Sequence, residues 1–124
     1  MRVLIVDEEP PAQEALAAIL ATQGDVEHFD CAGDSTEALA RMEYDEYDVL
    51  LLEVRLPPFS GIELVERLQR RPKPMPAVIF VTAHAEYAVV AFEKHAVDYV
   101  LKPFSPARIR QALAARAHAV KEER

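Results

Sequence analysis

The sequence has almost no cysteine, no tryptophan and no long hydrophobic run. Its one cysteine, Cys31, excludes a disulfide within the chain and any metal cluster built on several cysteines. The longest apolar runs, such as residues 50–52, fall far short of the ~20 residues that a membrane-spanning helix needs. The apolar start is too short for a signal peptide. These absences favour a protein of the reducing cytoplasm with no membrane segment.

Positive charge is also scarce, since the chain has 14 basic and 21 acidic side chains and a formal net charge of -7. A chain of this sign is repelled by phosphate backbones, so we expect no direct binding of nucleic acid, and any DNA contact would need another domain. The chain has 124 residues, of which 51% are hydrophobic, and it is therefore long enough to form one hydrophobic core. We therefore expect a single domain over residues 1–124, with no output domain in this chain.

Short apolar runs alternate with segments of helical pattern along the whole chain. The run at residues 49–52 is uninterrupted, which is typical of a strand buried on both faces in the middle of a sheet. A weaker, partly polar strand is expected nearer the sheet edge. Strict alternation with short connections predicts the α/β class, with a five-stranded parallel sheet and five helices on both of its faces. The other strands are expected at residues 3–6, 26–32, 77–81 and 97–101.

Several helix starts are marked by capping residues. Asp34 is a typical N-cap, and Ser60 with Glu63 matches the S-x-x-E capping box. A further helix is expected from about residue 85 to residue 94. On the last helix, Arg108 is expected to belong to a solvated face.

Acidic, hydroxyl and amino side chains stand at the carboxyl ends of the expected strands: Asp7 with Glu8, then Glu53, Thr82 and Lys102. In an open parallel sheet these ends meet at one crevice, where ligands bind. Two carboxylates 4 Å apart repel by roughly 4 kcal/mol at an effective dielectric near 20, so three of them require a cation or protonation. Lys102 supplies one positive charge, and Mg²⁺ held by oxygens is the natural second. Each residue alone has a simpler role as a helix cap or solvated strand end, but the ordered set favours a phosphoryl site.

These motifs resemble the receiver domain of two-component response regulators. The resemblance rests on residues 6–10, the central strand with Leu56-Pro57, residues 80–83 and residues 97–104, and it covers essentially the whole chain. Two further segments, residues 83–88 and 91–99, resemble the receivers of the subgroup that carries a LytTR-type DNA-binding domain. The resemblance implies a flavodoxin-like (β/α)5 fold and a cytoplasmic phosphoprotein that works in phosphorelay signal transduction and transcription regulation.

The same resemblance assigns roles to the residues at the strand ends. It makes Asp7 and Glu8 the acidic pair that binds Mg²⁺ together with Glu53, and it places Glu53 at the phosphoacceptor position, which is normally aspartate. Thr82 and Lys102 fall on the residues that contact the phosphoryl group.

Tyr99 falls on the aromatic residue that rotates in the family's conformational switch. Thr82 falls on the hydroxyl residue of the same switch. By the same analogy the Lys102-Pro103 peptide bond is expected to be cis.

Glu53 departs from the family pattern by one methylene. Its carboxylate would protrude by ~1.5 Å, and a misplacement near 1 Å can lower a rate on the order of a hundredfold. We therefore expect poor or absent phosphorylation. The glutamate can instead reach toward Lys102 or Thr82 and hold negative charge where a phosphoryl group would put it. The alternative is a phosphorylation-independent pseudo-receiver that acts as a protein-binding or dimerisation module.

The implied partners are a sensor histidine kinase, a DNA-binding output domain in a longer protein and a second copy in a homodimer. The chain is not expected to be an enzyme. The D-x-D nucleophile pattern of haloacid-dehalogenase-like phosphatases is replaced after the first strand by Asp7-Glu8-Glu9, and no P-loop, G-x-G-x-x-G or G-x-S-x-G motif occurs.

Overall fold

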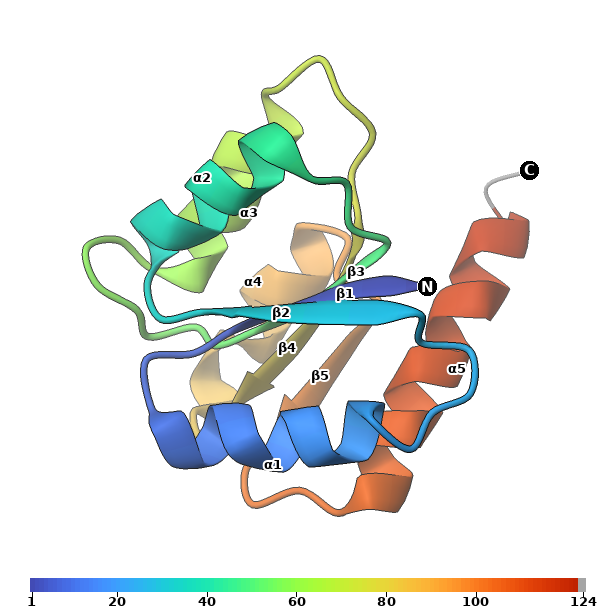
Figure 1. Cartoon of the computed structure of the whole chain (residues 1–124). Helices are drawn as coiled ribbons and strands as arrows, with labels where there is room; N and C mark the ends of the chain where they lie inside the picture. The colour runs from blue at the N-terminus through green and yellow to red at the C-terminus, as the bar shows by residue number, and fades with distance from the viewer. Residues whose placement is uncertain (123–124) are drawn as a thin grey trace.

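Five β-strands form one parallel sheet in the computed structural model of the chain, which describes residues 1–122, with side chains to residue 116 (Figure 1). The order across the sheet is β2-β1-β3-β4-β5. The third strand therefore lies in the middle and pairs with β1 and β4, while the partly polar β2 lies at an edge, as predicted. The strands are β1 Arg2–Val6, β2 His28–Ala32, β3 Val49–Leu52, β4 Ala77–Thr82 and β5 Asp98–Leu101.

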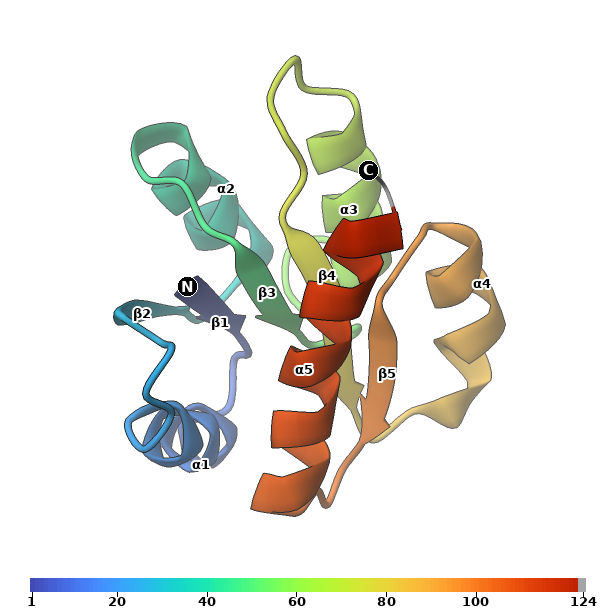
Figure 2. The same ribbon diagram turned by 90° about the vertical axis from the view of Figure 1, so that its right-hand side faces the viewer.

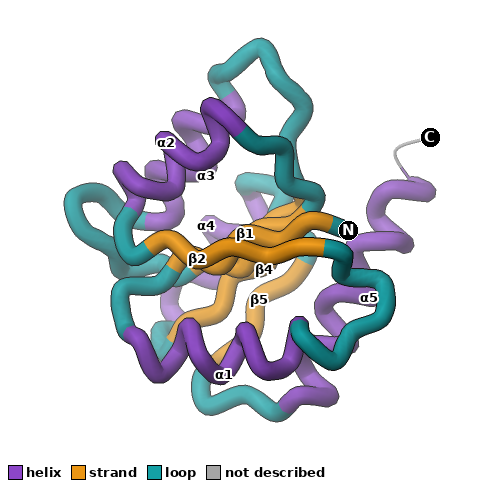
Figure 3. The backbone as a smooth tube through the Cα atoms, in the orientation of Figure 1, coloured by secondary structure: helices purple, strands orange, loops and turns teal. Residues whose placement is uncertain are grey.

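Five α-helices cover both faces of this sheet, so the predicted (β/α)5 fold is confirmed. Figure 2 shows α1 and α5 on one side of the strands and α2, α3 and α4 on the other. The backbone tube of Figure 3, coloured by secondary structure, shows the same layers. Two hydrophobic clusters fill the layers: one joins Leu4 and Leu52 to α2, α3 and α4, and the other joins Ile5 to α1 and α5. The helices are α1 Pro10–Leu20, α2 Ser35–Tyr44, α3 Gly61–Gln69, α4 Ala88–Glu93 and α5 Pro106–Glu122.

Alternate side chains of each buried strand enter opposite layers, which is why the central run has no polar position. The four residues of β3 are each at most 1% exposed. The predicted caps also form. The Asp34 carboxylate accepts from Glu37 N–H at 2.7 Å, and Ser60 Oγ accepts from Glu63 N–H at 3.1 Å. These caps satisfy amide groups that would otherwise lack partners in the first turn.

Two expectations differ from the structure. The predicted helix over residues 85–94 is split into a 3-10 turn, η1 Ala85–Tyr87, followed by the short α4, because the backbone of Tyr87, at φ -94° and ψ 2°, departs from α-helical geometry. Arg108 does not belong to a solvated face, since both of its terminal nitrogens donate to Asp98 at 2.8 Å. A helix pattern shows only that one face is polar, and it does not reveal a carboxylate on a neighbouring strand.

The peptide bond between Lys102 and Pro103 is cis, as predicted, and the bond between Pro57 and Pro58 is cis as well. None of the helices in the described part of the chain combines the length and the apolar character needed to cross a membrane.

Candidate functional site

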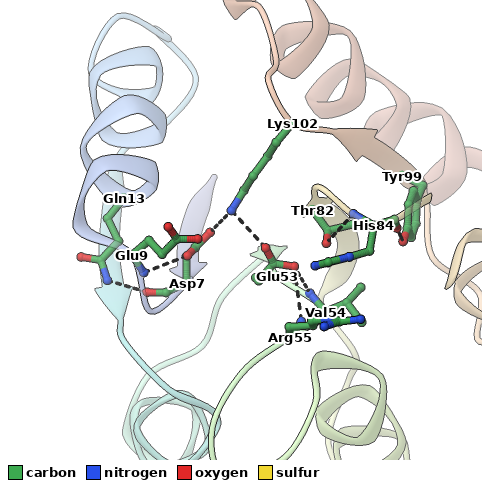
Figure 4. A network of polar contacts seen from close by, with 10 residues as sticks. All are labelled: Asp7, Glu9, Gln13, Glu53, Val54, Arg55, Thr82, His84, Tyr99 and Lys102. Atoms are coloured by element: carbon green, nitrogen blue, oxygen red, sulfur yellow. Dashed lines mark hydrogen bonds and ion pairs between the residues drawn. The ribbon is translucent and has the colours of Figure 1, made fainter. Parts of the chain in front are cut away.

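Four strands bring polar side chains to one edge of the sheet, as Figure 4 shows. Asp7 follows β1, Glu53 follows β3, Thr82 ends β4 and Lys102 follows β5. The backbone holds these positions in line: Glu53 N–H donates to the carbonyl of Val6 at 3.0 Å, and Lys102 N–H donates to that of Thr82 at 2.8 Å. The carboxyl ends of parallel strands therefore share one edge, the place where such sheets bind ligands.

The Lys102 ammonium group lies between two carboxylates from distant parts of the sequence. Its Nζ donates to Asp7 Oδ2 at 2.7 Å and to Glu53 Oε1 at 3.0 Å. Burial opposes the charge of this ammonium, but the hydrogen bonds to both acids and their negative charge outweigh burial, so the pKa of Lys102 lies above its ordinary value of 10.5. The side chains of Lys102, Asp7 and Glu53 are only 17%, 3% and 8% exposed. One partly buried cation thus lies between two buried anions.

Local hydrogen bonds hold Asp7 in place. Its Oδ1 accepts from the amide of Glu9 at 2.9 Å, and its carbonyl accepts from Gln13 Nε2 at 2.6 Å. Glu9 is the N-cap residue of α1, and Gln13 lies in the first turns of that helix. The sequence did not reveal the role of Gln13, because a glutamine on a helix carries no signal that distinguishes a site contact from a surface position.

Glu53 is engaged through both of its carboxylate oxygens. While Oε1 accepts from Lys102, Oε2 accepts from the amides of Val54 at 2.6 Å and Arg55 at 3.3 Å. Of the two contacts expected for this side chain, it makes the one to Lys102. The negative charge of Glu53 is therefore stabilised by one ammonium group and two backbone amides.

Gly61 allows α3 to approach the backbone of the site closely. A Cβ atom at this position would lie 2.2 Å from the carbonyl oxygen of Glu53 and 3.1 Å from the Leu52 side chain. The Gly61 amide also donates to the Val54 carbonyl at 2.7 Å. Any larger residue would push the start of α3 away from the end of β3, so the glycine is required by packing.

Thr82 and Tyr99 meet at the backbone of His84. The Thr82 hydroxyl accepts from His84 N–H at 3.3 Å, and the Tyr99 hydroxyl donates to the His84 carbonyl. The Tyr99 ring also lies 6.0 Å from the ring of Phe80. Burial, followed by the negative charges of Glu53 and Glu86, raises the pKa of Tyr99 above its ordinary value of 10.0, so the hydroxyl stays protonated and able to donate. The aromatic side chain is thus linked to the loop that follows Thr82.

The metal site expected from the sequence is only partly assembled. Among the side chains that the structure describes, up to residue 116, no group of three His, Cys, Asp or Glu is close enough to hold a metal ion. Asp7 and Glu53 face Lys102, while Glu8 is exposed to solvent. The donor chemistry nevertheless fits Mg²⁺, because this ion commonly binds through one or two carboxylates and completes its shell with water.

Comparisons with known proteins bear on the family and the fold of the chain. The family described as "Response regulator receiver domain" matches residues 3–114. The chain is 43% identical over 113 residues to the transcriptional regulatory protein LytR of Staphylococcus aureus (strain N315), which corresponds to 91% of this chain and 46% of LytR. It therefore spans about half the length of the curated relatives that it matches.

Solved structures show the same fold. The response regulatory domain of mrkE from Klebsiella pneumoniae superposes with a TM-score of 0.84 at 31% identity, covering 98% of this chain and 99% of that one. The response regulator TrrA from Thermotoga maritima, solved in complex with Mg²⁺ and BeF, has a TM-score of 0.80 at 28% identity and covers 93% of this chain and 97% of that one.

Proposed function

The chain belongs to the family of response regulator receiver domains of two-component signalling, and from this premise we propose that Glu53 occupies the position of the phosphoacceptor aspartate. The observation that carries the proposal is the position of Glu53 at the end of the central strand, 3.0 Å from Lys102, which also contacts Asp7. With a glutamate at this position the receiver is phosphorylated poorly or not at all.

The proposed roles of the other residues follow the chemistry of phosphoryl transfer. When aspartate is the acceptor, a carboxylate oxygen attacks the phosphorus of a phosphohistidine, the P–N bond breaks and the phosphoryl group moves to the carboxylate. Lys102 would neutralise charge on the transferred group, and the Thr82 hydroxyl would hydrogen-bond to it.

A magnesium ion would be held by Asp7, Glu8 and Glu53, and it would supply positive charge at the phosphoryl oxygens. The Mg²⁺ and BeF bound to the related TrrA support this assignment. In this chain Glu53 already places a negative charge against Lys102. The proposed consequence is a switch in which the glutamate replaces part of the effect of phosphorylation on Thr82 and Tyr99.

The proposed setting is cytoplasmic, with a sensor histidine kinase as the input partner. The relatives are transcriptional regulators about twice as long as this chain, which supports a DNA-binding output domain in a longer protein. The receiver itself, as one domain over residues 1–124, would act through protein contacts that include a homodimer. It would not bind nucleic acid directly, since its formal net charge is -7, and it would not turn over a substrate as an enzyme.

One observation favours a second function, a phosphorylation-independent module for protein binding or dimerisation. Both oxygens of Glu53 already have partners among Lys102 and the backbone amides of Val54 and Arg55. Local partners for both oxygens of Glu53 are what a receiver that works without phosphorylation would need at this position.

The test is an amide NMR titration of the chain and of its Glu53→Asp variant, first with Mg²⁺ and then with beryllofluoride as a phosphoryl mimic. We expect both proteins to respond to Mg²⁺ and only Glu53→Asp to respond to beryllofluoride, with shifts at Thr82, Tyr99 and Lys102. Glu53→Gln is the matched control, since it keeps the length of the side chain and removes its charge.

A response of the original chain to beryllofluoride equal to that of Glu53→Asp would refute the altered-acceptor proposal. If no protein in the series responds to either ligand, the second function is the correct one.

A further inference from the structure

A cavity of about 660 Å³ opens at the amino-terminal edge of the sheet, opposite the site described above. Its wall includes Asp48 before β3, Ala77 at the start of β4 and Val97 before β5. Figures 1 and 2 show that the loop between α3 and β4 and the last turns of α5 lie at this end of the molecule. Pockets for small molecules span roughly 300–1,000 Å³, so the cavity has the size of a ligand site.

The cavity combines apolar walls with two cationic groups, Arg71 and Lys73, for which no carboxylate partner is found among the described side chains. Met42, Met75 and Val97 contribute apolar surface. The Arg71 guanidinium also lines it, and its only described hydrogen bond is from Nη1 to the Met42 carbonyl at 3.4 Å. Among the described residues its buried Nε has no hydrogen-bond partner. A guanidinium whose one described hydrogen bond is this long can donate a stronger, charged hydrogen bond to an anionic oxygen in the cavity.

The other charged groups around the cavity are largely paired. Asp48 accepts from the amide of Arg2 at 2.7 Å and lies 3.7 Å from Arg116, and Lys94 binds Glu66 at 3.0 Å. These pairs leave the guanidinium as the strongest recognition element for an anion.

Two rim residues add to the local charge pattern. Lys73, two residues after Arg71, is exposed and adds positive charge, whereas Glu46 stands on the rim and repels an anion from its side. A ligand anion would therefore sit beside Arg71 and Lys73, with its apolar body away from them.

We propose that this cavity binds a small amphipathic organic anion, with its carboxylate against Arg71 and its apolar body against Met42, Met75 and Val97. The inference is independent of the proposed role of Glu53, because the two sites share no residue. Since the net charge of -7 opposes any general attraction of anions, binding must depend on the local guanidinium group.

The test uses octanoate as the probe, with 1-octanol as an uncharged molecule of the same chain length. Binding is followed by amide NMR of the whole chain and by calorimetry. We expect octanoate to shift the amide resonances of Ala77 and Val97. It should bind at least about tenfold more tightly than 1-octanol, because one charged hydrogen bond accounts for a gain in affinity of about that size. Arg71→Gln should remove this advantage and leave the binding of 1-octanol unchanged.

Arg70→Gln is the matched control, because Arg70 is the exposed neighbour in the sequence and does not line the cavity. It should bind octanoate like the original chain. The proposal is overturned if octanoate causes no shifts at this edge of the sheet, if 1-octanol binds as tightly, or if Arg71→Gln retains full affinity. Unchanged binding of 1-octanol by Arg71→Gln shows that the cavity remains folded.

Discussion

The carboxyl-edge cluster of Asp7, Glu53 and Lys102 differs from the pair of Asp98 and Arg108 that joins β5 to α5. Both contain short contacts, at 2.7 and 3.0 Å in the cluster and at 2.8 Å twice in the pair. The cluster sets one cation against two anions whose side chains are at most 8% exposed. The pair sets one cation against one anion, with side chains 34% and 20% exposed.

This difference gives the two groups different electrostatic requirements. A bidentate pair of equal and opposite charges is neutral by itself, and it fixes the orientation of two elements. The cluster carries an excess negative charge in a place that water hardly reaches, and such a charge is costly unless a cation is bound nearby. The cluster is therefore suited to receive a positive ion, whereas the pair has no such need.

The largest expected effect comes from Lys102→Met, which keeps the apolar stem and removes the cation. Two buried carboxylates are then left without a cationic partner, and breaking a buried ion pair in this way costs about 3–5 kcal/mol of unfolding free energy. Urea unfolding at pH 7 measures the loss, and added Mg²⁺ should recover part of it.

The pKa of Lys102 is raised in the folded chain, so its contribution to stability is fully present below its ordinary value of 10.5 and is lost as the pH rises through the folded value. The difference between Lys102→Met and the original chain should shrink accordingly in alkaline solution. Lys94→Met is the control: its partner Glu66 is 37% exposed, and we expect a cost of less than about 1 kcal/mol. Equal losses for the two variants would show that the cluster is no different from a surface pair.

Gly61→Ala tests whether the cluster depends on the close approach of α3 to Glu53. The added methyl group would meet the Glu53 carbonyl at 2.2 Å, and overpacking of this kind costs about 1–3 kcal/mol. We also expect amide NMR shifts at Glu53, Val54 and Lys102. Gly24→Ala is the matched control, since nothing lies within 4 Å of its added atom. A variant as stable as the control, with unchanged site amides, would contradict the packing account.

The smallest effect is expected for the pair, with Arg108→Gln costing about 1 kcal/mol after allowance for solvent screening. Hydrogen bonds from Arg108 hold the pKa of Asp98 below its ordinary value of 3.8 despite partial burial. The pair therefore stabilises the fold at pH values above 3.8, and its contribution is lost as the pH falls through the pKa of Asp98 in the folded chain. Unfolding at pH 7 and in steps below pH 4 should show the difference between variant and original chain disappear. Arg110→Gln is the control, and a pH-independent difference for Arg108→Gln would disprove the assignment.

Much of the fold could be predicted because it depends on local patterns. The run at residues 49–52 and the caps at Asp34 and Ser60 act through neighbouring residues, and all three appear as expected. The helical pattern assigns Arg108 to a solvated face, because it does not show Asp98, which lies on the neighbouring strand β5. The apolar pattern of residues 85–94 predicts one helix because it persists across the break, where only the backbone of Tyr87 leaves helical geometry.

The sequence by itself determined which residues stand at the strand ends, since hydrophobic runs set the strands and the parallel order places their carboxyl ends at one edge. Only the tertiary structure decided that Lys102 meets both Asp7 and Glu53, and that Glu8 remains in solvent. The reason is physical. Asp7 and Lys102 are 95 positions apart, and the direction of each side chain at the edge is set by packing, charge and backbone amides contributed by other elements.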